Sequence, residues 1–184
     1  MRIVCFGDSN TYGYDPRDNL GGRYGADSRW VDLLSKITGW QVRNRGENGR
    51  MIPSRFEQAE RMLKANAPVD IFLVMLGTND LLQGARVCEV TDRMENFLIH
   101  VRPLCKQILL VAPAPMQYGQ WVTEERLLGA SAQLGEAFRR LSERLDISFA
   151  DAGQWNVEMA FDGVHFTEEG HQRFAEGIKN HLML

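Results

Sequence analysis

A serine near the amino terminus and a histidine near the carboxyl terminus are the two residues of this sequence best suited to act together. Ser9 lies in the segment 7–10, which directly follows the apolar run 3–6, and His165 lies three residues after Asp162. A serine hydroxyl is almost un-ionised at neutral pH, so it needs a base within hydrogen-bond reach, and the base needs a carboxylate to orient it. We therefore predict that Ser9, His165 and Asp162 form the catalytic residues of an acyl-transfer site.

Such a site also needs hydrogen-bond donors for the oxyanion that forms on the attacked carbonyl group. The backbone N–H groups of Ser9 and Gly49 are two candidates, and a glycine lets the backbone approach a ligand closely because it has no Cβ. The side-chain amide of Asn79 is the third, since an amide donates without carrying a charge. We expect these three groups to make up the oxyanion hole.

Each of these motifs has a plainer structural explanation when it is taken alone. The segment 7–9 is ordinary turn chemistry, as is the segment 162–165, and Asn79 suits the start of a helix. Thr11 stands where the G-x-S-x-G motif needs its second glycine, which disfavours a standard α/β-hydrolase elbow. Only the combination of a serine, a histidine and a carboxylate favours catalysis.

The size, charge and apolar runs of the chain limit its class. With 184 residues, of which 44% are hydrophobic, residues 1–184 are expected to form one domain with one core. A net charge of −3 provides no basic face, so no nucleic-acid partner is expected. The longest apolar runs, 71–76 and 108–112, are too short to span a membrane, and no secretory signal is visible. These features predict a cytoplasmic protein without a membrane span.

Cysteine and histidine spacing gives no indication of a metal site. The three cysteines have no C-x-x-C spacing, and the three histidines other than His165 have no metal-ligand spacing. Cys5 lies within the first apolar run and is expected to be a small buried side chain. We therefore expect reduced thiols, no metal and no other cofactor.

Short apolar runs alternate with segments of helical periodicity along the chain. This pattern predicts strand–helix units wound into a parallel sheet. The expected strands cover residues 2–6, 41–45, 70–76, 106–112 and 147–151. The clearest helical face lies between residues 127 and 145, with Thr123 as its expected N-cap, and the last helix is expected to start near Thr167.

The chemically interesting residues follow the expected strands. Ser9 comes after the first strand, Gly49 after the second and Asn79 after the third, while His165 lies in the loop before the last helix. Ligands of an open parallel sheet bind at the carboxyl ends of its strands. We therefore expect these four segments to converge on one edge of the sheet.

Candidate substrate-contacting residues lie beside the nucleophile and after the fourth expected strand. They are Asp8, Asn10, Tyr12, Met116, Tyr118 and Trp121. The last three are expected to wall an acyl or aryl pocket, although plain packing explains them equally well. The oligomeric state stays open, and Trp40 and Trp155 are candidate contacts of a homo-oligomer.

Taken together, the four segments resemble the GDSL esterases, also called SGNH hydrolases after the Ser, Gly, Asn and His of their four blocks. The matching residues are Ser9, Gly49, Asn79, and Asp162 with His165, in the family's order. The segment 6–13 and the dipeptide 29–30 are most similar to the arylesterase and acyltransferase branch. Asn10 stands where the family name has Leu, which bears on substrate shape more than on chemistry.

The resemblance implies a flavodoxin-like three-layer α/β/α sandwich with a five-stranded parallel sheet. It also implies a serine ester hydrolase of the carboxylesterase or acetylesterase type that needs no metal and cleaves short-chain acyl esters through an acyl-serine. Water accepts the acyl group, and acyl transfer to alcohols is a further implied activity. The alternatives are a thioesterase or carbohydrate O-acetylesterase at the same site, and a non-catalytic module that binds a small ligand. A flavodoxin-like nucleotide binder is disfavoured because the carboxylate of Asp8 would repel phosphate.

Overall fold

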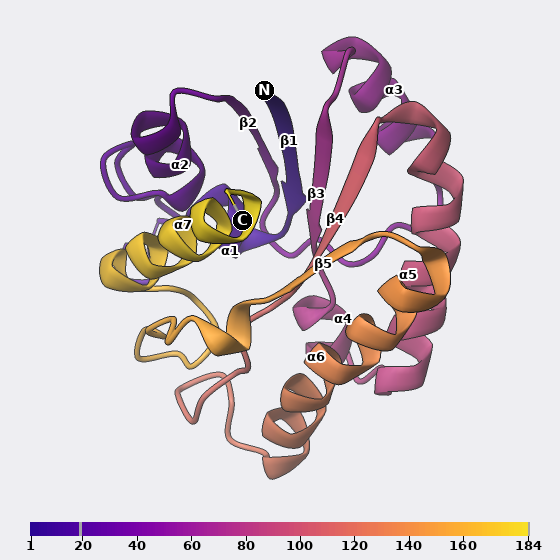
Figure 1. The fold of residues 1–184 in the computed structure, drawn as a ribbon. Helices are drawn as coiled ribbons and strands as arrows, with labels where there is room; N and C mark the ends of the chain where they lie inside the picture. The colour runs from indigo at the N-terminus through magenta and orange to yellow at the C-terminus, as the bar shows by residue number, and fades with distance from the viewer. Residues whose placement is uncertain (19, 184) are drawn as a thin grey trace.

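A five-stranded parallel sheet lies at the centre of the protein, with the strand order β2-β1-β3-β4-β5 (Figure 1). The computed structural model describes residues 1–18 and 20–183. The strands are β1 (Arg2–Gly7), β2 (Gln41–Gly46), β3 (Ile71–Met75), β4 (Gln107–Ala112) and β5 (Ser148–Asp151). Each predicted strand is confirmed to within one residue at either end.

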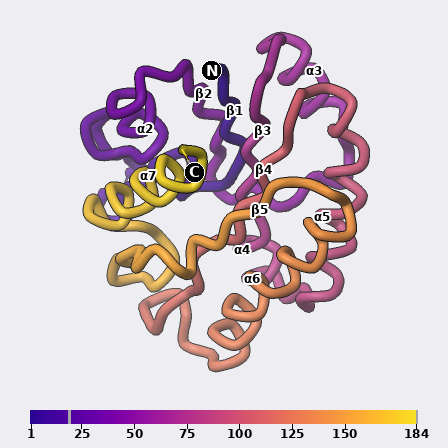
Figure 2. The backbone as a smooth tube through the Cα atoms, viewed as in Figure 1, coloured from indigo at the N-terminus to yellow at the C-terminus, as the bar shows by residue number. Residues whose placement is uncertain are grey.

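Helices cover both faces of this sheet. They are α1 (Ser9–Tyr12), α2 (Trp30–Thr38), α3 (Glu57–Asn66), α4 (Thr78–Leu82), α5 (Val87–Val101), α6 (Glu125–Leu145) and α7 (Glu168–Leu182), with short 3-10 turns at Arg102–Leu104 and Ala152–Gln154. Helices α2 and α7 pack on one face and α3, α5 and α6 on the other (Figures 1 and 2). The predicted three-layer α/β/α sandwich is therefore confirmed.

Alternation along the strands builds two hydrophobic layers. In β1, Ile3 and Cys5 pack toward α2 and α7, while Val4 and Phe6 pack toward α3, α5 and α6. All five residues of β3 are buried. Strands β1 and β3 are thus enclosed on both faces, as is typical of the central strands of a parallel sheet. They provide a rigid base for the loops that follow their carboxyl ends.

The two predicted helix starts have different outcomes. Thr167 is the N-cap of α7, and its hydroxyl accepts a hydrogen bond from the backbone N–H of Gly170 at 3.0 Å. The predicted cap at Thr123 is wrong, because α6 begins at Glu125 after an extended Glu124 that makes no side-chain capping bond. A hydroxyl residue before a periodic run is a common helix start, but here the chain stays extended for one more residue.

The two tryptophans named as candidate oligomer contacts pack partly against the core of the protein. Trp40 and Trp155 are half-buried against the layer formed with α2 and α7. The ring of Trp155 meets the ring of Phe174 edge-on at 5.2 Å.

Within residues 1–18 and 20–183, no helix combines the length and apolar composition that a membrane crossing requires.

Candidate active site

Ser9 lies on a sharp turn directly after β1. It is the first residue of the four-residue helix α1, and Asp8 caps this helix by accepting a hydrogen bond from the N–H of Asn10 at 3.0 Å. Gly13 ends the helix in the left-handed region (φ 92°), where its N–H donates to the carbonyl oxygen of Ser9 at 2.8 Å. The turn therefore holds Ser9 at the carboxyl end of β1.

His165 and Asp162 approach this turn from the loop that precedes α7. The Nε2 atom of His165 lies 2.9 Å from Ser9 Oγ, and its Nδ1 atom lies 2.7 Å from Asp162 Oδ2. All three side chains are buried, with exposed fractions of 6% or less. The structure thus brings the three residues singled out by the sequence into one continuous chain of hydrogen bonds.

The surroundings of Asp162 set the protonation pattern of this chain. Burial by itself would raise the pKa of Asp162. Hydrogen bonds from the His165 ring and from the backbone N–H groups of His165 and Val164 outweigh burial, so the pKa lies below its ordinary value. An ionised carboxylate accepts a hydrogen bond from Nδ1–H, which keeps the proton on Nδ1 and leaves Nε2 as the acceptor that faces the Ser9 hydroxyl. This is the tautomer that a general base needs.

A cavity of about 230 Å³ opens above Ser9. Its lining consists of Ser9, Tyr14, Asn48, Gly49, Asn79, Trp121 and His165. Gly49 adopts a left-handed conformation (φ 72°), which favours glycine. One hydrogen of the Asn79 amide goes to the carbonyl oxygen of Arg50 at 3.1 Å, and an amide carries a second one. Both predicted partners of the Ser9 N–H therefore line the same cavity as Ser9.

Asp80, the neighbour of Asn79, ties the Gly49 loop to α4. Its side chain is completely buried, and Oδ2 accepts a hydrogen bond from the N–H of Ile52 at 3.0 Å. The other oxygen, Oδ1, pairs with the guanidinium of Arg93 at 2.9 Å. Sequence reasoning missed this contribution, because it depends on a contact between residues 28 apart in the chain.

Two aromatic rings flank the histidine. The ring centroid of Tyr14 lies 4.6 Å from that of His165, and the ring of Trp121 meets the imidazole edge-on at 5.1 Å. Tyr14 was not among the predicted contacts, whereas Tyr12 was. The left-handed Gly13 reverses the chain after α1, so that Tyr14 faces the cavity. A glycine directly after a short polar turn was the sequence signal for this reversal.

Of the six candidate substrate contacts, only Trp121 lines the cavity. Asp8 and Asn10 belong to the nucleophile turn itself and are buried, and burial raises the pKa of Asp8 to about 6. The ring of Tyr12 lies under the guanidinium of Arg23 at 4.4 Å.

The remaining two candidates follow β4 but lie outside the lining. Met116 is buried in the hydrophobic layer beside α6, and Tyr118 is 64% exposed. The structure thus corrects the expectation that both wall the pocket. A residue that follows the fourth strand in sequence does not necessarily direct its side chain toward the carboxyl end of that strand.

The loop that carries Trp121 is held against the loop of Asp162. The N–H of Gln117 donates to the carbonyl of Gly163, and the N–H of Trp121 donates to that of Asp162, both at 3.0 Å. Gly163 has a positive φ of 81°, and a Cβ there would lie 2.1 Å from the carbonyl oxygen of Gln117. Close backbone contact between the two loops therefore needs this glycine.

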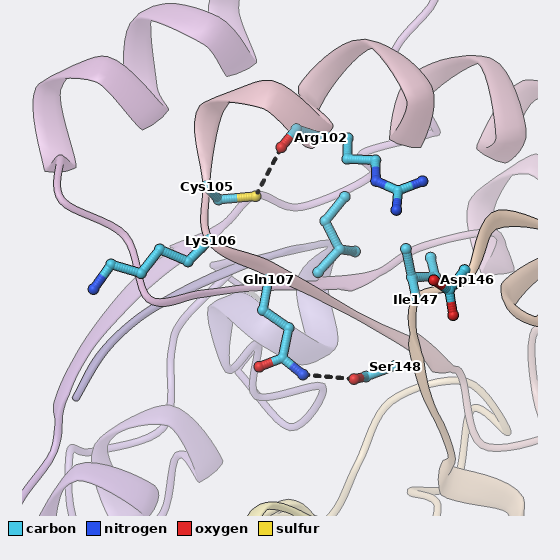
Figure 3. A pocket seen from close by; sticks show the side chains of 8 residues that line it. Arg102, Cys105, Lys106, Gln107, Asp146, Ile147 and Ser148 are labelled. Atoms are coloured by element: carbon cyan, nitrogen blue, oxygen red, sulfur yellow. Dashed lines mark hydrogen bonds between the residues drawn. The ribbon is translucent and has the colours of Figure 1, made fainter.

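A larger cavity of about 330 Å³ lies next to the amino ends of β4 and β5 (Figure 3). In this cavity the Gln107 amide donates to the Ser148 hydroxyl at 2.6 Å (Figure 3), and the Arg102 guanidinium donates to the carbonyl of Leu145 at 2.8 Å. Burial raises the pKa of the Cys105 thiol to about 11, so it is not a thiolate at neutral pH. Gln107, Ser148 and Arg102 thus already have hydrogen-bond partners within the protein.

The fold and the buried serine–histidine–aspartate chain together define an acyl hydrolase class. Residues 5–173 match the model of the GDSL-like lipase/acylhydrolase family, and the chain belongs to this family of ester hydrolases. No curated protein sequence matches the chain.

Solved structures show the same architecture. A putative arylesterase from Agrobacterium tumefaciens is 25% identical, with a TM-score of 0.86 over 100% of this chain and 99% of the other. The aryl esterase of M. smegmatis is 24% identical, with a TM-score of 0.84 over 97% of this chain and 98% of the other. A carbohydrate acetylesterase from Sinorhizobium meliloti is 22% identical, with a TM-score of 0.84 over 100% and 99%. The last two likenesses concern the fold alone.

Proposed function

We propose that this protein hydrolyses short-chain acyl esters through an acyl-serine intermediate on Ser9. The observation that carries the proposal is the unbroken hydrogen-bond chain from Asp162 through His165 to Ser9, with distances of 2.7 Å and 2.9 Å. A serine so placed has both the base and the orienting carboxylate that an acyl-transfer nucleophile needs.

The reaction has two steps, acylation of Ser9 and hydrolysis of the acyl-serine. Ser9 Oγ bonds to the acyl carbon while His165 Nε2 takes its proton, and His165 then returns that proton to the leaving alcohol oxygen as the C–O bond breaks. Water next attacks the acyl-serine and gives a proton to Nε2, and the carboxylic acid departs as the proton returns to Ser9 Oγ. Asp162 stabilises the imidazolium in both steps.

The oxyanion of each tetrahedral intermediate needs preorganised donors. We assign this role to the N–H groups of Ser9 and Gly49 and to the side-chain amide of Asn79. Their support is that all three residues line one cavity together with His165. Such donors are most effective in a site from which water is largely excluded.

The size and walls of the cavity favour a small acyl group on a ring-shaped alcohol. At about 230 Å³ the cavity is smaller than the usual pocket for a drug-sized ligand. His165 protonates the leaving oxygen, so the alcohol must lie near Tyr14 and Trp121, whose rings suit an aryl or sugar ring. Acyl transfer to an alcohol in place of water would use the same intermediate.

Reaction with a fluorophosphonate tests the proposal directly. We expect a stoichiometric covalent adduct on Ser9, located by mass spectrometry of the peptides, and none in Ser9→Ala. The same variant should hydrolyse an aryl acetate at close to the background rate. An unlabelled Ser9 in the folded protein would instead favour a module that only binds a small ligand.

A further inference from the structure

The side chain of Asn10 bonds to the backbone on both sides of His165. Its Nδ2 donates to the carbonyl oxygen of Val164 at 3.0 Å, and its Oδ1 accepts from the N–H of Phe166 at 2.9 Å. Asn10 itself directly follows Ser9 in the chain. One amide therefore joins the neighbour of the nucleophile to both neighbours of the base.

The orientation of this amide is unambiguous. A carbonyl oxygen can only accept and a backbone N–H can only donate, so exchanging Nδ2 and Oδ1 would break both hydrogen bonds. The local pairing of the loop explains why the N–H of Phe166 is available. The antiparallel bridge between Met159 and Phe166 uses the carbonyl of His165 and the N–H of Thr167, so the N–H of Phe166 points to the other side.

The nucleophile turn holds Asn10 firmly in place. Its N–H donates to the carboxylate of Asp8 at 3.0 Å, and its carbonyl oxygen accepts from the indole N–H of Trp30 at 3.0 Å. The Asn10 residue is only 5% exposed, and Trp30 is fully buried against Phe174. The amide therefore connects two backbone segments through a well-ordered residue and does not line the substrate cavity.

We propose that Asn10 is a positioning residue that locks the His165 loop onto the nucleophile turn. The inference rests on the proposed function of Ser9 and His165. These two residues lie 156 positions apart, and the 2.9 Å hydrogen bond between them is broken whenever the proton moves. The two bonds of Asn10 join groups that do not react, so they keep Nε2 aligned with Ser9 Oγ through both steps of the reaction.

The first test is Asn10→Leu, which keeps a similar volume and removes both hydrogen bonds. We expect kcat and the rate of Ser9 phosphonylation to fall about 10²-fold, the scale of a displacement of roughly 1 Å, while KM changes little. The downfield proton resonance of the His165–Asp162 hydrogen bond should persist, because both residues belong to one loop. Slower phosphonylation with this resonance retained would show that Ser9 and His165 are misaligned while the His165 loop stays folded.

Ser131→Ala provides a matched control. The buried Ser131 hydroxyl also joins two backbone groups, accepting from the N–H of Met116 and donating to the carbonyl of Leu128, both at 3.0 Å. This variant should lose stability comparably and phosphonylate Ser9 at the wild-type rate.

A second variant, Asn10→Asp, has nearly the same side-chain shape, so it provides a test even if Asn10→Leu does not fold. A protonated carboxyl can still donate to the carbonyl of Val164, whereas a carboxylate repels it. The ratio of variant to wild-type phosphonylation rates should therefore fall as the pH rises, and it should stay low at alkaline pH. Recovery of the ratio at alkaline pH would show that the lost hydrogen bond to the carbonyl of Val164 does not limit the labelling rate.

The proposal is overturned if folded Asn10→Leu labels Ser9 as fast as the wild type, if Ser131→Ala slows labelling equally, or if the Asn10→Asp ratio recovers at alkaline pH. Failure of the proposed function has a different signature, because wild-type Ser9 would then not be labelled at all.

Discussion

At the scale of single residues, the reactivity of Ser9 depends on what surrounds three side chains rather than on their types. Asp162 accepts hydrogen bonds from two backbone N–H groups at 2.9 Å in addition to the bond with the His165 ring, and these bonds keep its pKa low despite burial. Asp8 is buried only one residue before Ser9, and burial raises its pKa to about 6. Two carboxylates close to one imidazole therefore have different environments, and only Asp162 is hydrogen-bonded to its ring.

Asn79→Ala tests the amide donor. Removing one oxyanion donor typically lowers kcat by about 10² to 10³, and we expect this loss with little change in KM, measured by steady-state hydrolysis of an aryl acetate. Because the amide also donates to the carbonyl of Arg50, a small decrease in thermal stability is expected as well. An unchanged kcat would remove Asn79 from the oxyanion hole.

At the scale of elements, the site depends on tight backbone contact between segments distant in the sequence. The loop of Trp121 pairs with the loop of Asp162, and Gly46 at the end of β2 packs against the nucleophile turn, where a Cβ would lie 2.1 Å from the N–H nitrogen of Tyr12. These contacts leave no room for side chains. Glycines at such positions hold catalytic loops in place without touching the substrate.

Gly163→Ala should therefore impair both stability and catalysis. The new Cβ would overlap the carbonyl oxygen of Gln117, and a left-handed φ of 81° costs an alanine about 1 to 2 kcal/mol before any overlap. We expect a decrease of at least about 2 kcal/mol in the free energy of unfolding, measured by urea denaturation, together with a lower kcat.

Gly129→Ala is the matched control. Gly129 lies in α6 without a positive φ, and among the described residues a Cβ there would meet no atom of a neighbouring element within 4 Å. Alanine is the better helix former by about 1 kcal/mol, so this variant should be at least as stable as the wild type and equally active. Equal effects of the two substitutions would contradict the role given to Gly163.

At the scale of the whole molecule, burial of His171 links stability to pH. His171 is fully buried, and its Nδ1 accepts from the N–H of Trp30 at 3.4 Å. Burial lowers its pKa to about 3. The unfolded chain takes up a proton below about pH 6.5 whereas the native protein does not until about pH 3, so stability is lost as the pH falls through this window.

His171→Phe should remove this dependence. Between about pH 7.5 and about pH 5 the wild type should lose about 2 kcal/mol more of its unfolding free energy than the variant, measured by urea denaturation at both pH values. Asp8 titrates in the opposite sense, because its raised pKa favours the native state at low pH, and it contributes equally to both proteins. Parallel pH profiles would show that His171 does not titrate on unfolding.

The volume of the cavity predicts a limit on the acyl chain. With about 230 Å³ shared between acyl group and alcohol, kcat/KM for aryl esters should be highest for acetate to butyrate and fall steeply beyond about four acyl carbons. A series of aryl esters of increasing chain length measures this, with thioesters and sugar acetates of the preferred acyl group as further arms. Highest kcat/KM on long-chain esters would contradict the short-acyl preference.

Sequence alone was sufficient for the five strands, because strands follow from local apolar patterns. It was also sufficient for the proximity of Ser9, Asp162 and His165, because the loops at the carboxyl ends of parallel strands meet at one edge of the sheet. It failed for Thr123, where the helix starts later than its hydroxyl residue suggests, and for Met116 and Tyr118, whose directions depend on how the loop after β4 folds.

What the sequence by itself determined is therefore the layer order of the sandwich and the residue types that meet at the ends of β1, β2 and β3. The tertiary structure decided the rest: that Tyr14 rather than Tyr12 faces the cavity, and that Asn10 bonds to the His165 loop rather than to a substrate. The physical reason is that apolar periodicity is a local property of the chain. The direction of a side chain on a loop depends instead on local turn geometry, as at Gly13, and on contacts with segments distant in the sequence, as between Asn10 and the His165 loop.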